Sequence, residues 1–283
     1  MTQSSSDGLL RQWTPDVRHV RLGGTTVRVA TSGEGPPLLL LNGIGGNIDM
    51  WEPVARRLTD RTLIMFDAPG TGGSPALRWP VRMKRYAALV VRLLDELGVD
   101  RSDVLGYSWG GALAQELAHR APERVGAVVL GATLPGLGGQ PPAPWVIAAM
   151  ATPARYYSPT YLRLISPLVF GSAPDSAADS SHGRARARRP PSLRGYSQQL
   201  YTITGWSSRP WLRTLTAPVL VLSGSRDPLV PLRNARILAR AIPDARLQII
   251  EGGHLFLLER SDEACRIVSA FLDERGEKGL SST

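Results

Sequence analysis

Short apolar segments that alternate with amphipathic helix patterns predict a doubly wound α/β fold with a mostly parallel sheet. The chain has 283 residues, 43% of them hydrophobic and 20% charged, which suits one large domain with a buried core. The strand segments are apolar almost throughout, as is typical of parallel strands buried on both faces. One long interruption of the alternation, after residue 134, indicates an insertion.

The predicted elements follow one another in a regular order. The strand patterns "TTVRVA" and "PLLLLN" (25–30 and 37–42) precede a helix pattern at 50–58. The strand pattern "TLIMFD" (62–67) precedes a helix pattern at 82–97, which repeats its apolar residues with helical spacing. The remaining elements continue this alternation: strands at 103–108, 125–132, 218–224 and 246–252, and helices at 110–120, 232–241 and 262–275.

The interruption has the composition of a helical cap. It contains five of the seven tyrosines but no buried-strand pattern. We therefore predict a core formed by residues 1–134 and 211–283, with a cap inserted at 135–210. The cap would lie over the carboxyl ends of the strands, where ligands of such sheets bind. Its middle, 172–194, is rich in Ser, Ala and Pro, and we expect irregular structure there.

Charge and composition exclude several classes of protein. The formal net charge is +9, but the one basic cluster, at 184–189, has no interleaved aromatic residues for base stacking. We interpret this cluster as a solvated loop, with contact to an anionic surface as the alternative, and expect no nucleic-acid partner. The amino end lacks the pattern of a signal peptide, and no apolar run is long enough to span a bilayer. Cys265 is the single cysteine, which excludes an internal disulfide, and we expect it to pack in the last helix.

The segment "GYSWGG" (106–111) marks a candidate nucleophile, Ser108. It directly follows an apolar strand and directly opens a helix pattern, which is the context that a G-x-S-x-G turn needs. A serine at such a turn has a strained backbone, and small neighbours are required because strand and helix come close together. Gly106 and Gly110 supply those small residues.

Position in the chain selects the partners of Ser108. Of the four histidines, only His254 lies in a loop directly after a predicted strand, in "EGGHLFLLE"; His19 precedes the predicted sheet. His119 lies near the far end of the helix that Ser108 opens, and His182 lies in the predicted irregular segment. His254 is therefore the predicted base, because its loop reaches the nucleophile's edge of the sheet.

Asp227 in "LSGSRDPLVP" is the predicted orienting acid, because the order Ser, Asp, His along the chain matches the nucleophile-elbow scheme. Two other aspartates follow or precede strands. Asp67 in "FDAPG" is expected to tie down its own turn, and Asp244 lies at the wrong end of the sheet. No cysteine and histidine cluster has zinc spacing, so we expect no metal and no cofactor.

The loop in "LLLLNGIGGN" (38–47) suits an oxyanion site. It lacks the third glycine of a dinucleotide fingerprint and the lysine of a phosphate-binding loop. We expect the backbone amides of Ile44 and Trp109 to stabilise an oxyanion, with the Gly45 amide as second choice to Ile44. Asn42 is expected to brace the loop through its side-chain amide.

These segments resemble those of α/β-hydrolase-fold serine hydrolases with a cap. Within that superfamily the chain is most similar to the intracellular, medium-chain-length poly(3-hydroxyalkanoate) depolymerases. The resemblance covers about residues 38–258 and is carried by "NGIGGNIDMWEPV", "FDAPGTGGSP", "SWGGALAQ", "TPARYYSPTY", "GWSSRPWL" and "GHLFL". It implies a cytoplasmic serine esterase in which Ser108, Asp227 and His254 form the catalytic triad. It also implies polymeric or oligomeric hydroxyalkanoate esters as substrates, with the polyester granule surface as a candidate partner.

The cap aromatics are the expected walls of an acyl pocket. They are Trp145, Tyr156, Tyr157, Tyr161, Tyr196, Tyr201 and Trp206. As substrate-binding residues we name Trp145, Tyr157, Tyr201 and Trp206 among them, together with Asn42, Gly45 and Leu255. The segment "PDSAADSSHGRARARRPPS" (174–192) departs from the depolymerase pattern, which leaves polymer and small-ester substrates as alternatives.

Some other functions fit the sequence equally well, and others fit it less well. A general carboxylesterase or lactonase for small acyl esters shares the same triad, as do carbon–carbon hydrolases and perhydrolases. Dehalogenases and epoxide hydrolases require an aspartate at the position of Ser108. A non-catalytic ligand-binding protein of the same fold usually has a damaged triad, whereas this chain has all three members. Substrate choice depends on the cap and pocket, which sequence patterns specify poorly.

Overall fold

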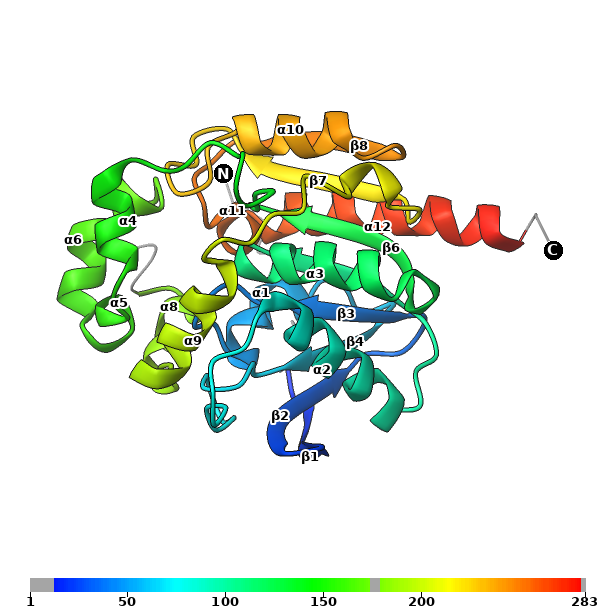
Figure 1. Ribbon diagram of the computed structural model, residues 1–283, viewed down its shortest axis with the longest axis horizontal. Coiled ribbons are helices and arrows are strands. Elements are labelled where there is room, and N and C mark those ends of the chain that lie inside the picture. The colour runs from blue at the N-terminus through cyan, green and yellow to red at the C-terminus, as the bar shows by residue number, and fades with distance from the viewer. Residues whose placement is uncertain (1–12, 174–178, 281–283) are drawn as a thin grey trace, which may run out of the picture.

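A computed structural model of the protein describes residues 13–173 and 179–280, and it confirms the α/β fold with a mostly parallel sheet (Figure 1). Eight strands form one sheet in the order β1-β2-β4-β3-β5-β6-β7-β8. Strand β2 pairs with β1 and with β4, and both run antiparallel to it. All other pairs of neighbouring strands in this sheet are parallel. The strands are β1 (Asp16–Leu22), β2 (Thr25–Ser32), β3 (Pro37–Leu41), β4 (Thr62–Phe66), β5 (Ser102–Tyr107), β6 (Val125–Gly131), β7 (Val219–Gly224) and β8 (Ala245–Ile250).

All seven expected strands are present, but β1 was not expected. The placement of His19 before the sheet is therefore wrong, because His19 lies in β1 and faces Arg28 of β2. Most side chains of β1 are exposed, since this strand forms the edge of the sheet. An edge strand with charged residues on it lacks the apolar run that reveals the central strands.

Helices cover both faces of the sheet. The helices α2 (Met83–Glu96), α3 (Trp109–Arg120) and α10 (Arg233–Ala241) pack on one face, and α1 (Glu52–Ala55), α11 (Phe256–Glu259) and α12 (Ser261–Leu280) pack on the other. Successive leucines of β3 point to opposite faces of the sheet. Leu39 packs in the core beneath α3, and Leu40 packs in the core beneath α12. Cys265 is buried in the second core, as expected, and burial raises the pKa of its thiol to about 12. Three short 3-10 turns complete the core: η1 (Ile48–Trp51), η2 (Pro122–Arg124) and η3 (Leu212–Thr214).

Five helices of the described chain between β6 and β7 lie beyond the carboxyl ends of the parallel strands (Figure 1). They are α4 (Pro144–Met150), α5 (Ala154–Tyr157), α6 (Pro159–Val169), α8 (Ser181–Arg188) and α9 (Leu193–Ile203). The expected irregular structure at 172–194 is wrong for its second half, where α8 forms; residues 174–178 lie outside the described part. Ser180 caps α8 by accepting a hydrogen bond from the Gly183 amide, which explains where this helix begins. Among the described residues no helix is long and apolar enough to cross a bilayer.

Glycines allow α3 to approach the sheet closely. A Cβ atom on Gly110 would lie 2.0 Å from the backbone oxygen of Leu41 in β3. A Cβ atom on Gly106, at the end of β5, would lie 2.4 Å from the backbone oxygen of Gly110. Neither gap accommodates a methyl group, so both positions require glycine for packing rather than for backbone freedom.

We predict that Gly110→Ala lowers the free energy of unfolding by about 1–3 kcal/mol, because the new methyl group forces α3 away from β3. Urea unfolding followed by circular dichroism measures this loss. The matched control is Gly24→Ala, since a Cβ atom on Gly24 meets no other atom within 4 Å. Equal stability of the two variants would contradict this packing argument.

Candidate active site

Ser108 lies at the sharp turn between β5 and α3, where the sequence places it. Its backbone has φ 56° and ψ −116°, a conformation that non-glycine residues rarely adopt. Two hydrogen bonds hold this peptide: the Ser108 amide donates to the Gly131 oxygen at 2.8 Å, and its carbonyl accepts from the Thr133 hydroxyl at 2.8 Å. The turn therefore presents the side chain of Ser108 above the carboxyl ends of the strands.

The structure brings His254 to Ser108. The imidazole Nε2 lies 3.1 Å from the Ser108 Oγ, and the Nδ1 lies 2.7 Å from the Asp227 Oδ2. The loop after β8 is fixed at its backbone, because the His254 amide donates to the Phe170 oxygen at 2.6 Å and the His254 carbonyl accepts from the Tyr107 hydroxyl. The ring is buried between the rings of Tyr107 and Phe170.

Asp227 completes the hydrogen-bonded chain from the loop after β7. Its Oδ2 contacts His254, and its Oδ1 accepts hydrogen bonds from the amides of Leu229 and Val230 at 2.9 and 2.8 Å. Both oxygens of this buried carboxylate thus have hydrogen-bond partners. The arrangement can hold one tautomer of His254, with the proton on Nδ1 and the acceptor Nε2 toward Ser108.

The other candidate acids and bases lie elsewhere. Asp67 accepts hydrogen bonds from the amides of Ile48 and Gly73 and from Arg28, so it ties two loops together. Burial raises the pKa of Asp67, and these donors oppose that shift. His119 stacks on Trp211 with ring centroids 4.3 Å apart, and His182 is buried within α8.

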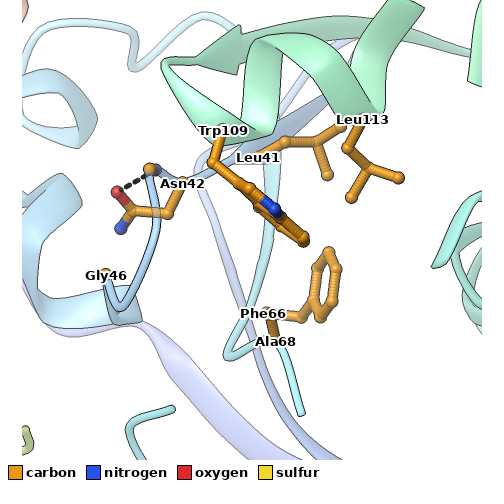
Figure 2. Close-up of a pocket in the computed structure, with 8 residues that line it drawn as sticks. Leu41, Asn42, Gly46, Phe66, Ala68, Trp109 and Leu113 are labelled. Atoms are coloured by element: carbon orange, nitrogen blue, oxygen red, sulfur yellow. Dashed lines mark hydrogen bonds between the residues drawn. The ribbon is translucent and has the colours of Figure 1, made fainter. Parts of the chain in front are cut away.

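The loop after β3 is braced by Asn42. Its Oδ1 accepts a hydrogen bond from the Gly43 amide at 2.8 Å (Figure 2). Its Nδ2 donates to the Asn47 oxygen, also at 2.8 Å. The Gly45 amide donates to Gln199 Oε1 at 2.6 Å and is therefore engaged. Within residues 13–173 and 179–280, the amides of Ile44 and Trp109 make no hydrogen bond. These two amides are thus free to donate to an oxyanion.

The indole of Trp109 ties α3 to the helices beyond the sheet. Its ring lies beside Phe66 and Leu113 under the first turn of α3 (Figure 2), and its edge meets the ring of Tyr86. Its Nε1 donates a hydrogen bond to the Thr202 hydroxyl in α9 at 2.8 Å. This hydrogen bond holds Trp109 in place, and the backbone amide of Trp109 is the one directly after Ser108.

A cavity of about 30 Å³ lies beside Ser108 and His254. Such a volume holds only one or two water molecules. Its lining combines the loop after β3 with side chains from the inserted helices: Asn42, Gly43, Ile44, Gly46, Met50, Tyr107, Ser108, Met150, Arg155, Tyr156, Phe170, Arg186, Leu229, His254 and Leu255. Of the expected substrate-binding residues, Asn42 and Leu255 line it, and Gly45 packs against the Tyr156 ring just behind it.

Of the seven cap aromatics expected as pocket walls, only Tyr156 lines this described cavity; Tyr161, Tyr196 and the four named as substrate-binding residues do not. Trp145 on α4 and Tyr157 on α5 are 64% and 53% exposed, and the Tyr157 hydroxyl donates to the Pro191 oxygen. Tyr201 lies under the guanidinium of Arg82, 4.2 Å from the ring centroid. Trp206 donates a hydrogen bond to Glu116 at 2.8 Å. The helical period explains the difference at α5, since it turns Tyr156 inward and Tyr157 outward.

Two arginines in the cavity lining were not expected from the sequence. Arg186 belongs to the basic cluster, so its interpretation as a solvated loop is wrong: Arg186 is 3% exposed and lies on the inner face of α8. Burial lowers the pKa of its guanidinium, and the nearby charge of Arg155 acts in the same direction. Arg155 is equally buried and donates hydrogen bonds to the Thr152 oxygen and the Tyr196 hydroxyl. No helix was predicted at either position, so no helical face was available from which their inward orientation could be read.

Comparisons with known proteins agree with this geometry. A family profile for the alpha/beta hydrolase fold matches residues 36–261. The chain is 40% identical, over 93% of its length and 94% of the relative's, to a poly(3-hydroxyalkanoate) depolymerase of Ectopseudomonas oleovorans. It is 27% identical, over 84% and 88% of the two lengths, to 3-oxoadipate enol-lactonase 2 of Acinetobacter baylyi. The solved enol-lactonase of Burkholderia xenovorans LB400 matches with a TM-score of 0.79 at 27% identity, covering 90% of this chain and 100% of that one.

Acid should destabilise the protein through His182 in α8. Burial, assisted by the charge of Arg186, lowers the pKa of His182 from 6.5 to about 3. Below pH 6.5 the unfolded chain binds a proton at His182 that the folded protein does not bind until about pH 3. We therefore expect this group to lower the free energy of unfolding by up to about 1.4 kcal/mol per pH unit as the pH falls through that window.

Urea unfolding of wild type and His182→Gln near pH 7 and pH 5 measures this effect. The variant should lose less stability on acidification than the wild type. The control His119→Gln, at a partly exposed ring stacked on Trp211, should retain the wild-type loss. Identical pH dependence of wild type and His182→Gln would contradict the prediction.

Proposed function

This chain belongs to the α/β-hydrolase fold family and is a carboxylic ester hydrolase, and we propose that it cleaves 3-hydroxyalkanoate esters through an acyl-enzyme on Ser108. The observation that carries the proposal is the hydrogen-bonded chain from Asp227 through His254 to Ser108. The substrate class rests on the relative with 40% identity, a poly(3-hydroxyalkanoate) depolymerase. Apolar residues beside Ser108, such as Met150, Leu229 and Leu255, suit an alkyl side chain of such a substrate.

In the proposed mechanism His254 Nε2 takes the proton of Ser108 as its Oγ attacks the ester carbonyl carbon. Asp227 keeps the Nδ1 proton in place and stabilises the imidazolium that forms. The tetrahedral intermediate collapses, the carbon–oxygen bond to the alcohol breaks, and His254 gives the proton to the leaving oxygen. Water then enters, His254 accepts its proton, and hydroxide attacks the acyl-enzyme to release the acid.

The developing oxyanion would bind to the amides of Ile44 and Trp109. The Trp109 amide begins α3, so the helix dipole adds to its attraction for negative charge. The Ile44 amide lies in the loop that Asn42 braces. Preorganised donors of this kind stabilise the transition state because they need no rearrangement during the reaction.

The cap at 135–210, set on a core of 1–134 and 211–283, would control access. Because the cavity is small, a substrate with an alkyl chain requires the cap helices to shift outward. Exposed apolar residues on α4 and α6, among them Trp145, Leu164 and Leu168, form the surface that we assign to contact with a polyester granule. A cytoplasmic location would fit such a substrate.

A small-ester or lactone substrate is the alternative for the same site. The likeness to enol-lactonases in sequence and in structure favours it. A binding protein without activity is the alternative from another class. It would retain the same fold but would not need a serine held within hydrogen-bond distance of a histidine.

Ser108→Ala should lower the turnover of every substrate by at least about 10³-fold, because no other oxygen nucleophile replaces the serine. A panel of nitrophenyl esters of increasing acyl length, hydroxyalkanoate oligomers and polyester granules, tested with wild type and variant, measures this. Full activity in the variant would disprove the mechanism. Activity on short nitrophenyl esters alone would favour the small-ester alternative, and no activity in the wild type would favour the binding protein.

Asn42→Ala should lower kcat by about 10-fold, because the loop that carries the Ile44 amide loses both hydrogen bonds of the Asn42 side chain. The readout is steady-state kinetics with a nitrophenyl ester. Asn47→Ala is a matched control, since the Asn47 side chain donates to Ala185 and Arg189 in the cap rather than to the loop. A wild-type kcat in Asn42→Ala would exclude the bracing role.

A further inference from the structure

Arg186 is a buried cation in the lining of the cavity beside Ser108. Its side-chain Nε and Nη1 atoms are inaccessible to solvent and have no hydrogen-bond acceptor within the described part of the chain. Among the residues that the structure describes, no carboxylate lies within 4.0 Å of its guanidinium. The negative charge of Glu259 acts on it only at longer range.

Burial of a guanidinium without a hydrogen-bond acceptor is unfavourable. The rings of Tyr156 and Phe170, each with its centroid 5.4 Å from the Arg186 guanidinium, offset part of this cost by cation–π attraction. Arg155, the second buried cation in the lining, repels Arg186 and has its own neutral partners. The cavity lining therefore contains two positively charged side chains. Among the described residues, the Nε and Nη1 atoms of Arg186 lack a hydrogen-bond acceptor.

We propose that Arg186 binds a free carboxylate of the substrate, so that the enzyme selects esters ending in a carboxylate over neutral ones. The inference rests on the proposed ester hydrolysis at Ser108. A planar guanidinium fork matches a carboxylate through two parallel hydrogen bonds, one of which would come from an orphaned donor and the other from Nη2. Because Arg186 and Ser108 line the same small cavity, the carboxylate lies only a few bonds from the scissile ester.

The terminal unit of a hydroxyalkanoate chain has this form, since two carbons separate its ester oxygen from its carboxylate carbon. Attack by Ser108 on the last ester breaks the bond to that unit, which leaves as a free hydroxy acid after taking a proton from His254. One water molecule then releases the shortened chain with a new carboxylate. The enzyme would thus remove units stepwise from the carboxyl end. A lactone that carries a carboxylate offers the same group to Arg186.

The test compares the hydroxybutyrate dimer as its free acid with the same dimer as its primary amide, which is neutral and of equal size. Wild type should show a kcat/KM at least about 10-fold higher for the acid. Arg186→Gln should lower kcat/KM for the acid by about 10- to 100-fold and change that for the amide by less than about 3-fold. Arg186→Lys, which keeps the charge without the fork, should restore part of the preference.

Arg188→Gln is the matched control, because Arg188 lies on the same helix but is exposed; it should keep the wild-type preference. Equal rates of wild type on acid and amide, or an equal loss of both in Arg186→Gln, would overturn the inference. If Arg186→Gln does not fold, the wild-type preference and inhibition by butyrate but not butyramide decide the question. Comparing kcat/KM for a lactone that carries a carboxylate with that for its amide shows whether Arg186 also binds the carboxylate of a lactone or only that of a hydroxyalkanoate chain end.

Hydrolysis of neutral nitrophenyl butyrate separates the two proposals. If wild type cleaves it and Ser108→Ala does not, while acid and amide dimers react alike, only the carboxylate inference fails. If wild type cleaves none of these esters, the proposed function itself fails.

Discussion

The close contact between the first turn of α3 and the carboxyl end of β3 is the constraint on which the site depends. With no side chain at Gly110, the helix approaches the Leu41 oxygen so closely that a methyl group would lie 2.0 Å from it. That approach holds Ser108 at a positive φ, and it also places the Trp109 amide beside the loop that begins at Asn42. The proposed nucleophile and one of the two proposed oxyanion donors thus depend on a single packing contact.

The inserted helices are bound to the same loop that carries the second donor. The Tyr156 hydroxyl donates to the Ile44 oxygen, Gln199 accepts from the Gly45 amide, and Asn47 donates to the Ala185 oxygen. The Phe170 oxygen likewise accepts from the His254 amide. Movement of the cap therefore breaks contacts to both the oxyanion loop and the histidine loop, which couples substrate access to the geometry of the reacting groups.

Sequence patterns predicted the central sheet because buried parallel strands are apolar in nearly every residue, as in β3. They missed β1, since an edge strand with Arg18 and Arg21 has no such run. The positions of Ser108, Asp227 and His254 followed from their places directly after strands. The residues that line the cavity could not be predicted in this way, because they depend on how each helix of the cap is rotated about its axis. Composition does not show that Tyr156 faces inward and Tyr157 outward, or that one arginine of a basic cluster is buried.

The central claim is that Ser108 forms an acyl-enzyme, and mass spectrometry of the protein during turnover tests it most directly. Wild type mixed with excess nitrophenyl ester and quenched in acid should gain the mass of one acyl group. Peptide mapping should place that group on Ser108, in the peptide that joins β5 to α3. Rapid turnover with no adduct, or an adduct on another residue that forms and decays at the catalytic rate, would contradict the account.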